Sequence, residues 1–235
     1  ATSFHEGTTS IRAFTTKGEP FFNVDVKGKL RGFTSAAPDP DGRRRLTAIS
    51  EDAGKIVVYD AGGDGSSRFI DLGEPLTSYA VINVVGDGRP EIVALTAAGV
   101  VKVTDPAGAV LHVIAAPEGR VAEVRVLDVD GDDRRDVVAT LADGGGVAVF
   151  EPEGKLKARI APPPRFRGAG LRFVDLDRDG PREFVLVKEV AAKAGERKTV
   201  VAAFDVNGRL RFETTLRGGR ARHTTADVDA DGKED

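Results

Sequence analysis

Two nine-residue segments of the chain each crowd four carboxylates into a single turn. They span residues 175–183 and 227–235, with acidic side chains at the first, third, fifth and ninth positions and glycine at the sixth. Oxygen ligands held in a tight loop are what calcium prefers, and the backbone carbonyl of the seventh position adds one more. Without a cation, four neighbouring carboxylates would repel one another. We therefore expect both segments to bind calcium.

A third segment, residues 128–136, keeps all four carboxylates but has Asp133 where the others have glycine. Aspartate adopts a left-handed backbone more readily than most residues, so we expect the turn to form at some cost and to bind calcium more weakly. The predicted ligands of about three calcium sites, with the seventh-position carbonyls included, are Asp175, Asp177, Asp179, Pro181 and Glu183; Asp227, Asp229, Asp231, Lys233 and Asp235; and Asp128, Asp130, Asp132, Arg134 and Asp136.

Two more segments have lost part of the pattern. An arginine at the ninth position of one of them puts a positive charge where a ligand belongs, so we expect that loop to be empty. A valine at the third position of the other offers no side-chain oxygen, so we expect that loop to be empty or weak. The residues at the ligand positions are Ala37, Asp39, Asp41 and Arg45 in the first loop, and Asn83, Val85, Asp87 and Glu91 in the second.

The five acidic segments mark a repeat. Their fifth positions are Asp41, Asp87, Asp132, Asp179 and Asp231, separated by 46, 45, 47 and 52 residues. Each copy has an apolar strand, the acidic loop, a second strand, a glycine-containing turn and two more strands. Apolar residues occupy both strand faces, as they must when a sheet lies between two neighbours. The pattern predicts an all-β fold, a five-bladed β-propeller of four-stranded antiparallel blades in one domain, residues 1–235. In the third copy the predicted strands are 121–127, 136–141, 146–150 and 156–160.

The two ends of the chain are in register with this repeat. Four residues follow Asp231 and 41 lead from Ala1 to Asp41, which gives 45, the length of an internal repeat. We therefore expect strands from the N-terminus to complete the C-terminal blade and close the ring, which would remove the free sheet edges. The predicted blades are residues 31–74, 75–118, 119–164 and 168–218, and residues 219–235 together with 1–30.

The fourth repeat is longer than the others, and its excess lies in residues 188–198. Loops carry function while strands carry the fold, so a partner-binding insertion is one interpretation. A longer hairpin exposed to solvent is the other.

Composition excludes several classes of protein. The chain has 34 basic and 37 acidic residues, a formal net charge of -3, and no basic run longer than the three arginines at 43–45, so nucleic-acid binding is not expected. Hydrophobic residues make up 40% of the chain without a run of about 18 apolar residues, so membrane insertion is not expected. There is no cysteine, which rules out disulfides and thiolate metal sites.

The chain begins at Ala1 and contains no methionine. We interpret its N-terminus as processed, excised or engineered, and expect any signal peptide to have been removed. The expected location is extracellular or periplasmic, and the expected state is a monomer.

Catalytic motifs are absent from the sequence. It has no nucleophile elbow, zinc-binding helix signature, phosphate-binding loop or dinucleotide fingerprint. Two of the three histidines, His5 and His112, fall in predicted outer strands, where a structural role is expected. We therefore predict that the protein is not an enzyme.

A set of polar residues on the innermost predicted strands suggests an anion site at the mouth of a central channel. Arginine binds carboxylates and phosphates well, but interblade pairing with Glu123 and backbone carbonyls would explain the same residues without a ligand. A sugar site is disfavoured because the chain has no tryptophan and only two tyrosines. The candidate residues are Arg125, Arg172, Arg222, His223 and Tyr79.

The loop Asp-x-Asp-x-Asp-Gly-x-x-Asp/Glu between two strands, recurring every 45 to 52 residues, resembles the FG-GAP/VCBS repeat family. That family includes integrin α-subunit propellers and many secreted bacterial proteins. The resemblance covers the whole chain and implies calcium in the hairpins between first and second strands, on the face opposite the usual ligand-binding loops. Family members commonly have seven or eight blades, so five is a departure.

Three functions remain open at this stage. The first is a calcium-binding propeller that serves as a binding or scaffold module for protein partners. The second is carbohydrate or small-anion binding at the central mouth. The third is a designed or permuted propeller without a native ligand.

Overall fold

The computed structural model divides into two compact units, residues 1–115 and 116–235. The residues that the structure describes are 2–35, 45–51, 54–60, 67–116, 119–142, 146–166, 169–176, 180–191 and 196–217.

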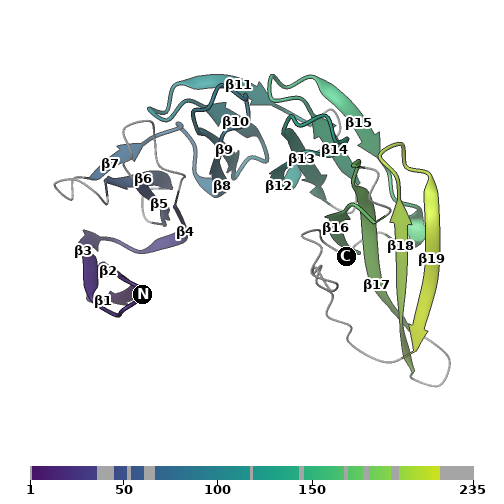
Figure 1. Cartoon of the computed structure of the whole chain (residues 1–235), viewed down its shortest axis with the longest axis horizontal. Coiled ribbons are helices and arrows are strands. Elements are labelled where there is room, and N and C mark those ends of the chain that lie inside the picture. The colour runs from purple at the N-terminus through teal and green to yellow at the C-terminus, as the bar shows by residue number, and fades with distance from the viewer. Residues whose placement is uncertain are drawn as a thin grey trace. The chain divides into compact units, whose positions relative to one another are not determined.

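The first unit contains three antiparallel sheets in which consecutive strands are neighbours (Figure 1). The three-stranded sheet consists of β1 (Thr2–His5), β2 (Thr8–Phe14) and β3 (Pro20–Lys27). The next consists of β4 (Leu30–Ser35), β5 (Arg45–Ser50), β6 (Lys55–Asp60) and β7 (Ser67–Ile70). The last consists of β8 (Leu76–Ile82), β9 (Glu91–Thr96), β10 (Val101–Thr104) and β11 (Val110–Ile114).

The second unit contains two four-stranded antiparallel sheets with the same strand order. One consists of β12 (Val121–Leu127), β13 (Asp136–Leu141), β14 (Val147–Phe150) and β15 (Leu156–Ile160). A single 3-10 turn, η2 (Pro164–Phe166), follows it. The other consists of β16 (Gly170–Val174), β17 (Glu183–Ala191), β18 (Arg197–Phe204) and β19 (Leu210–Arg217).

These meanders confirm the predicted all-β fold, because a four-stranded antiparallel sheet of consecutive strands is the blade of a β-propeller. The strands of the third blade lie where the sequence places them, and β14 starts one residue later than expected. In the fifth blade the described part is the sheet β1–β2–β3. Residues 219–235, which are predicted to join it, lie outside the described residues, so ring closure stays a prediction.

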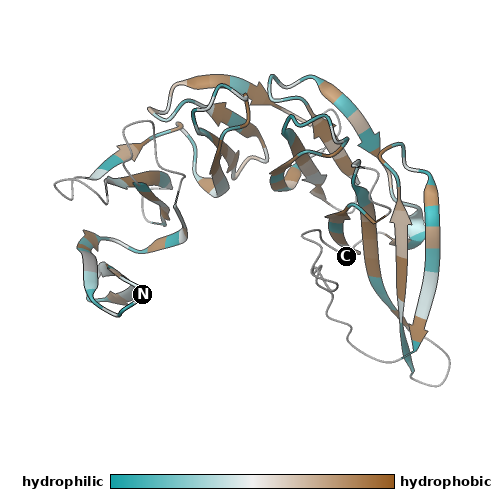
Figure 2. Cartoon of the chain, viewed as in Figure 1, coloured by the Kyte–Doolittle hydropathy of each residue, from teal (hydrophilic) through white to brown (hydrophobic). Residues whose placement is uncertain are grey.

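Burial follows the position of a strand within its blade. All six residues of β9 and all four of β14 are buried, whereas β19 is exposed along its whole length. Middle strands bury both faces because each sheet packs against a neighbour. Figure 2 shows the resulting concentration of hydrophobic residues in the strands. In the second unit, Phe173 and Phe184 pack edge to face with ring centroids 4.9 Å apart.

The same contact joins successive blades in both units. Ile70 ends β7, and a Cβ added at Gly108 in the turn before β11 would lie 2.5 Å from its Cγ2 atom. Ile160 ends β15, and a Cβ added at Gly208 in the turn before β19 would lie 3.8 Å from its Cγ2 atom. In each case the isoleucine of one blade lies beside the turn glycine of the next. At Gly108 this leaves no room for a larger residue, whereas a Cβ at Gly208 would be in ordinary van der Waals contact.

The long repeat forms an extended hairpin. Strands β17 and β18 pair as far as Ala191 and Arg197, and Arg197 forms an ion pair with Glu189 at 3.2 Å (Figure 1). The described part of the 188–198 segment therefore continues the sheet, as the longer-hairpin interpretation expects.

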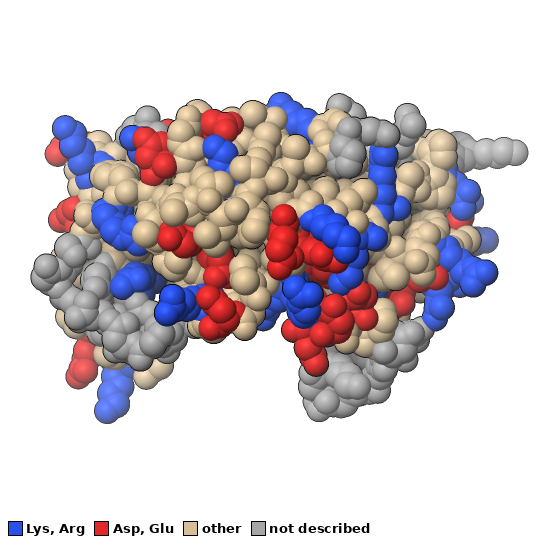
Figure 3. Space-filling model, turned by 90° about the horizontal axis from the view of Figure 1, so that it is seen from above, with Lys and Arg blue, Asp and Glu red and all other residues tan. Residues whose placement is uncertain are grey.

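Basic and acidic side chains are intermixed on the face seen in Figure 3, in keeping with a formal net charge of -3. Within the described ranges, the structure contains no helix with the length and apolarity needed to cross a membrane.

Candidate metal centre

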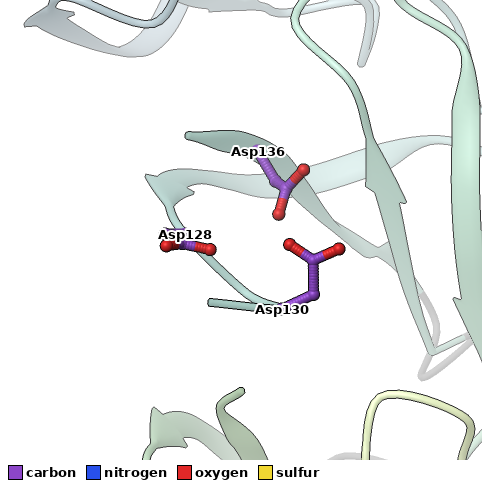
Figure 4. Close-up of side chains that lie close together, drawn as sticks. All are labelled: Asp128, Asp130 and Asp136. Atoms are coloured by element: carbon purple, nitrogen blue, oxygen red, sulfur yellow. The ribbon is translucent and has the colours of Figure 1, made fainter. Parts of the chain in front are cut away.

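The loop between β12 and β13 brings three of its predicted ligands together. Asp128 and Asp130 lie in the loop and Asp136 begins β13, and one carboxylate oxygen from each lies within 4.8 Å of the others (Figure 4). Asp136 is almost fully buried, with 1% of its surface exposed. Two ligands on opposite sides of a calcium ion are about 5 Å apart, because calcium–oxygen distances are about 2.3–2.6 Å. The cluster therefore has the dimensions of a calcium site.

Backbone amides hold this loop in shape. The amide of Val129 donates to the Asp136 carboxylate at 3.1 Å, which ties the second position of the loop to the ninth. The amides of Gly131 and Asp133 both donate to the Asp128 carboxylate, at 2.8 and 3.0 Å. At the fifth position, Asp132 accepts the amide of Arg134 at 2.9 Å, and this hydrogen bond is the first cause of the lowered pKa of Asp132.

The second and fourth loops share the backbone frame of the third, which is the hydrogen bond from the amide of the second position to the carboxylate of the ninth. Glu91 accepts the amide of Val84 at 2.8 Å, and Glu183 accepts the amide of Leu176 at 2.8 Å, so the bond between the second and ninth positions recurs. The second loop forms although Val85 stands at its third position. The frame thus folds without a full set of carboxylates, and the extra carboxylates of the third and fourth loops need another explanation.

A left-handed residue at the sixth position completes the turn. Gly88 and Gly180 have φ angles of 84° and 100°, and Asp133 has 63° at the equivalent place. The structure thus confirms that aspartate tolerates this conformation in the third loop, at the energetic cost that a side chain brings there.

The third and fourth loops are in direct backbone contact. The amide of Arg182 donates to the carbonyl of Val129 at 2.7 Å. A Cβ added at Gly131 would lie 2.9 Å from the carbonyl carbon of Gly180, so glycine is required at this contact. A change in the shape of one loop is therefore felt by the other.

Unpartnered oxygens in these loops support a cation. Asp130 Oδ1 in the third loop and Asp175 Oδ1 in the fourth are both buried without a hydrogen-bond partner among the described residues. A buried carboxylate oxygen without a partner has lost its hydration, and a bound cation would restore a contact to it. The charge of Asp130 is meanwhile paired through its other oxygen with Lys157, at 2.7 Å. The residues present therefore fit calcium, with Asp128, Asp130 and Asp136 as its holders in the third loop.

Lys157, which sequence analysis did not identify, reaches into the third loop from β15. Its Nζ lies 2.7 Å from Asp130 Oδ2, 3.1 Å from Asp136 Oδ1 and 3.5 Å from an oxygen of Asp132. Burial opposes the charge of this ammonium, but the hydrogen bonds to Asp130 and Asp136 outweigh burial and raise the pKa of Lys157. Burial of the Asp136 carboxyl raises its own pKa.

The other predicted metal residues are placed as follows. Arg134 turns its guanidinium outward to Glu153, at 3.5 Å, so only its carbonyl is left for a ligand role. In the fourth loop, Asp175 accepts the amide of Gly180 at 3.2 Å and Glu183 is buried. Pro181 lies between them in the described part of the loop. The residues that lie outside the described part of the chain are Ala37, Asp39, Asp41, Asp177, Asp179, Asp227, Asp229, Asp231, Lys233 and Asp235.

The candidate anion residues are engaged locally. Arg125 forms an ion pair with Glu123 on its own strand at 2.9 Å, and Arg172 donates to the backbone carbonyl of Leu171 at 2.9 Å. Tyr79 forms hydrogen bonds with the carbonyl of Gly32 and the hydroxyl of Thr47, both at 2.9 Å. Arg222 and His223 lie outside the described residues. The described arginines thus have partners without a ligand, but the Arg125–Glu123 pair lies within one strand and not between blades as the ligand-free interpretation expects.

Both tyrosines are expected to stay neutral at unusually high pH. Burial raises the pKa of Tyr59 and of Tyr79 from 10.0 to about 12. Because the pKa values are higher in the folded state, the neutral tyrosines contribute fully to the free energy of unfolding below pH 10.0. This contribution is lost as the pH rises through about 12. The chain has no tryptophan, so phenolate absorbance measures these two groups directly. The folded protein should form phenolate about two pH units later than the urea-unfolded chain, and coincident titrations would contradict the assignment.

Replacing each tyrosine by phenylalanine distinguishes the contributions of the two hydroxyls to the free energy of unfolding. The Tyr59 hydroxyl is buried without a hydrogen-bond partner in the described structure, so Tyr59→Phe is expected to leave the free energy of unfolding unchanged or slightly raised. Tyr79→Phe removes two hydrogen bonds and should lower it by about 1–2 kcal/mol.

A cavity of about 190 Å³ lies between the sheets of the third and fourth blades. Sites for sugars and anions present several polar groups that orient the ligand. Among the described residues around this cavity, Thr140 supplies the one polar side chain, so the cavity does not favour such a ligand. The lining residues are Thr140, Leu141, Gly146, Val147, Ile160, Pro162, Phe166, Ala169, Leu171, Phe184, Leu186 and Phe204.

Comparison with solved structures agrees with the fold. The V. cholerae biofilm matrix protein Bap1 matches 92% of this chain at 17% identity and a TM-score of 0.58. The dihydro-heme d1 dehydrogenase NirN matches 90% at 16% identity and 0.58, and BBS1N, from a complex with ARL6DN, matches 91% at 12% identity and 0.52. At these identities the likeness concerns the fold alone.

The chain spans 34% of Bap1, 43% of NirN and 76% of BBS1N. No protein-family profile and no curated protein sequence matches the chain. The resemblance to FG-GAP/VCBS repeats therefore rests on the loops themselves.

Proposed function

We propose that this chain is a calcium-binding β-propeller that serves as a binding or scaffold module for a protein partner, and that it is not an enzyme. The observation that carries the proposal is the carboxylate cluster of Asp128, Asp130 and Asp136, which has the dimensions of a calcium site and gathers its oxygens around one cationic group, the Lys157 ammonium. The recurrence of the loop frame in neighbouring blades, and its FG-GAP/VCBS-like sequence, support calcium as the ion.

The fourth and fifth loops are the tight sites of this proposal and the third is weaker. Ions at all three would change the formal net charge from -3 to +3. We place the protein outside the cytoplasm, in an extracellular or periplasmic setting, because modules of this kind bind calcium at about 0.1–1 mM.

An outer strand offers a surface for the partner. Strand β19 pairs with β18 on one side only among the described residues, and all eight of its residues are exposed. Its exposed hydrophobic residues are Leu210, Phe212 and Leu216. A free strand edge with apolar side chains suits an extended segment of another protein, which would add a strand to the sheet.

Calorimetric titration of the chelated protein with calcium tests the proposal. We expect tight uptake at the fourth and fifth loops and weaker uptake at the third. Asp179→Asn should remove one tight ion, while Asp87→Asn, at the same position of the second loop, should remove none. Chelated protein that is folded yet takes up no calcium at about 1 mM would overturn the proposal.

A further inference from the structure

We propose that Lys157 takes the place of a metal ion in the third loop and thereby weakens calcium binding there. This inference deepens the proposed function, on which it rests for calcium as the ion of the other loops. The ammonium lies within 2.7 to 3.5 Å of carboxylate oxygens from Asp130, Asp132 and Asp136, which are the third, fifth and ninth positions of the loop.

The ammonium and a calcium ion need the same place. Calcium bound to these oxygens would lie about 2.3–2.6 Å from each, inside the shell that Nζ now occupies. Two cations cannot share that position, because their van der Waals volumes would overlap there and their like charges repel each other. Calcium can therefore enter the third loop only when Lys157 leaves it.

The backbone directs Lys157 into the loop. Leu156 pairs with Phe150 and Ala158 pairs with Val149, which leaves Lys157 as the extra residue of a bulge between them. A bulge turns a side chain away from the regular alternation of a strand. The Lys157 side chain is accordingly 25% exposed, whereas that of its neighbour Lys155, paired with Glu151, is 75% exposed.

The other blades provide an internal comparison. The pairing of β10 with β11 and of β18 with β19 has the same bulge, which places Leu111 and Arg211 at positions equivalent to Lys157. The third and fourth blades, whose loops have the full set of carboxylates, carry a basic residue at the bulge. The second blade, which has Val85 in its loop, carries leucine there instead. The fifth blade, whose loop is also fully acidic, has Phe21 at the equivalent bulge between β2 and β3, so a basic residue is not a general companion of an acidic loop. The role of Lys157 therefore rests on its own contacts with the carboxylates.

Replacing Lys157 tests the inference by calcium titration. In Lys157→Met, which keeps the aliphatic stem, the third loop should bind calcium at least tenfold more tightly than in the parent protein. Lys155→Met removes the same charge from the same strand and should leave calcium affinity unchanged. Adding Asp130→Asn to Lys157→Met should abolish the gain, which assigns the new affinity to the third loop.

Stability in chelator gives a second measurement. Without its ammonium and without calcium, the third loop has four uncompensated carboxylates, so Lys157→Met should unfold at a lower temperature than Lys155→Met in EDTA and recover in calcium. If the methionine variant is unstable, Lys157→Leu, which introduces the residue that the second blade has at Leu111, repeats the test. Unchanged calcium affinity in both Lys157 variants, or an equal gain in Lys155→Met, would overturn the inference.

The outcome is separable from that of the proposed function. Calcium uptake by the parent protein with no gain in the Lys157 variants rejects the role of Lys157 alone. No uptake by the parent protein and one ion gained in the Lys157 variants rejects the proposed calcium sites of the other loops and retains Lys157 as a substitute for a metal.

Discussion

Calcium is expected to raise the unfolding temperature of this protein by about 8 °C for each tight site. At a free concentration one hundred times the dissociation constant, an ion that binds only the folded state adds about 2.7 kcal/mol to the free energy of unfolding. In a chain of this size each kcal/mol corresponds to about 2–4 °C. Circular dichroism of chelated protein, with and without added calcium, measures the shift.

Substitutions in the loops show where the stabilisation arises. Asp177→Ala and Asp229→Ala remove the third-position ligand of the two tight loops, and each should reduce the calcium-dependent shift by about half. Asp87→Ala, in the second loop, should leave the shift intact and serves as the control. A protein that stays folded in chelator and shows no shift with calcium would contradict this prediction.

Gly131→Ala is expected to lower the free energy of unfolding by about 2–3 kcal/mol. Gly131 has a φ of 75°, where alanine costs about 1 kcal/mol. The added Cβ would also lie 2.9 Å from the carbonyl carbon of Gly180, which would push the third and fourth loops apart. Loss of the hydrogen bond between Arg182 and Val129 would then add about 1–2 kcal/mol.

Gly86→Ala is the matched control. Gly86 occupies the same fourth position in the second loop, with a φ of 87° and open space where the alanine Cβ would lie. We expect this variant to lose about 1 kcal/mol, which is the backbone cost alone. Urea denaturation of both variants measures the difference, and equal losses would mean that the contact between the loops contributes nothing.

Much of the fold follows from the sequence because it is periodic. The interval between the acidic loops fixed the number of blades, and the alternation of apolar runs with glycine turns located the strands of the third blade to within one residue. The predicted role of Asp133 in a left-handed turn is confirmed for the same reason, since the repeat shows which conformation that position must adopt. Periodicity also predicts ring closure, but that prediction depends on residues 219–235, which lie outside the described residues.

The part of the site that escaped sequence analysis depends on side-chain direction. Lys157 lies 21 residues beyond Asp136 and enters the loop only because a bulge redirects it. A comparison of the bulge positions across blades, where Lys157 is equivalent to Arg211, Leu111 and Phe21, would have singled it out as one of two basic residues at such a place. Arg125 shows the opposite case, because its nearest partner is Glu123 on its own strand, two residues away.

The contacts of Ile70 with Gly108 and of Ile160 with Gly208 bear on how such a chain changes during evolution. Both interfaces consist of an isoleucine at the end of one blade and a glycine in a turn of the next. A duplicated blade would therefore already contain both residues of the contact. Unequal recombination could then add or remove whole blades without the evolution of a new interface between blades. The number of blades in a chain of this type would accordingly vary more easily than the composition of any single interface.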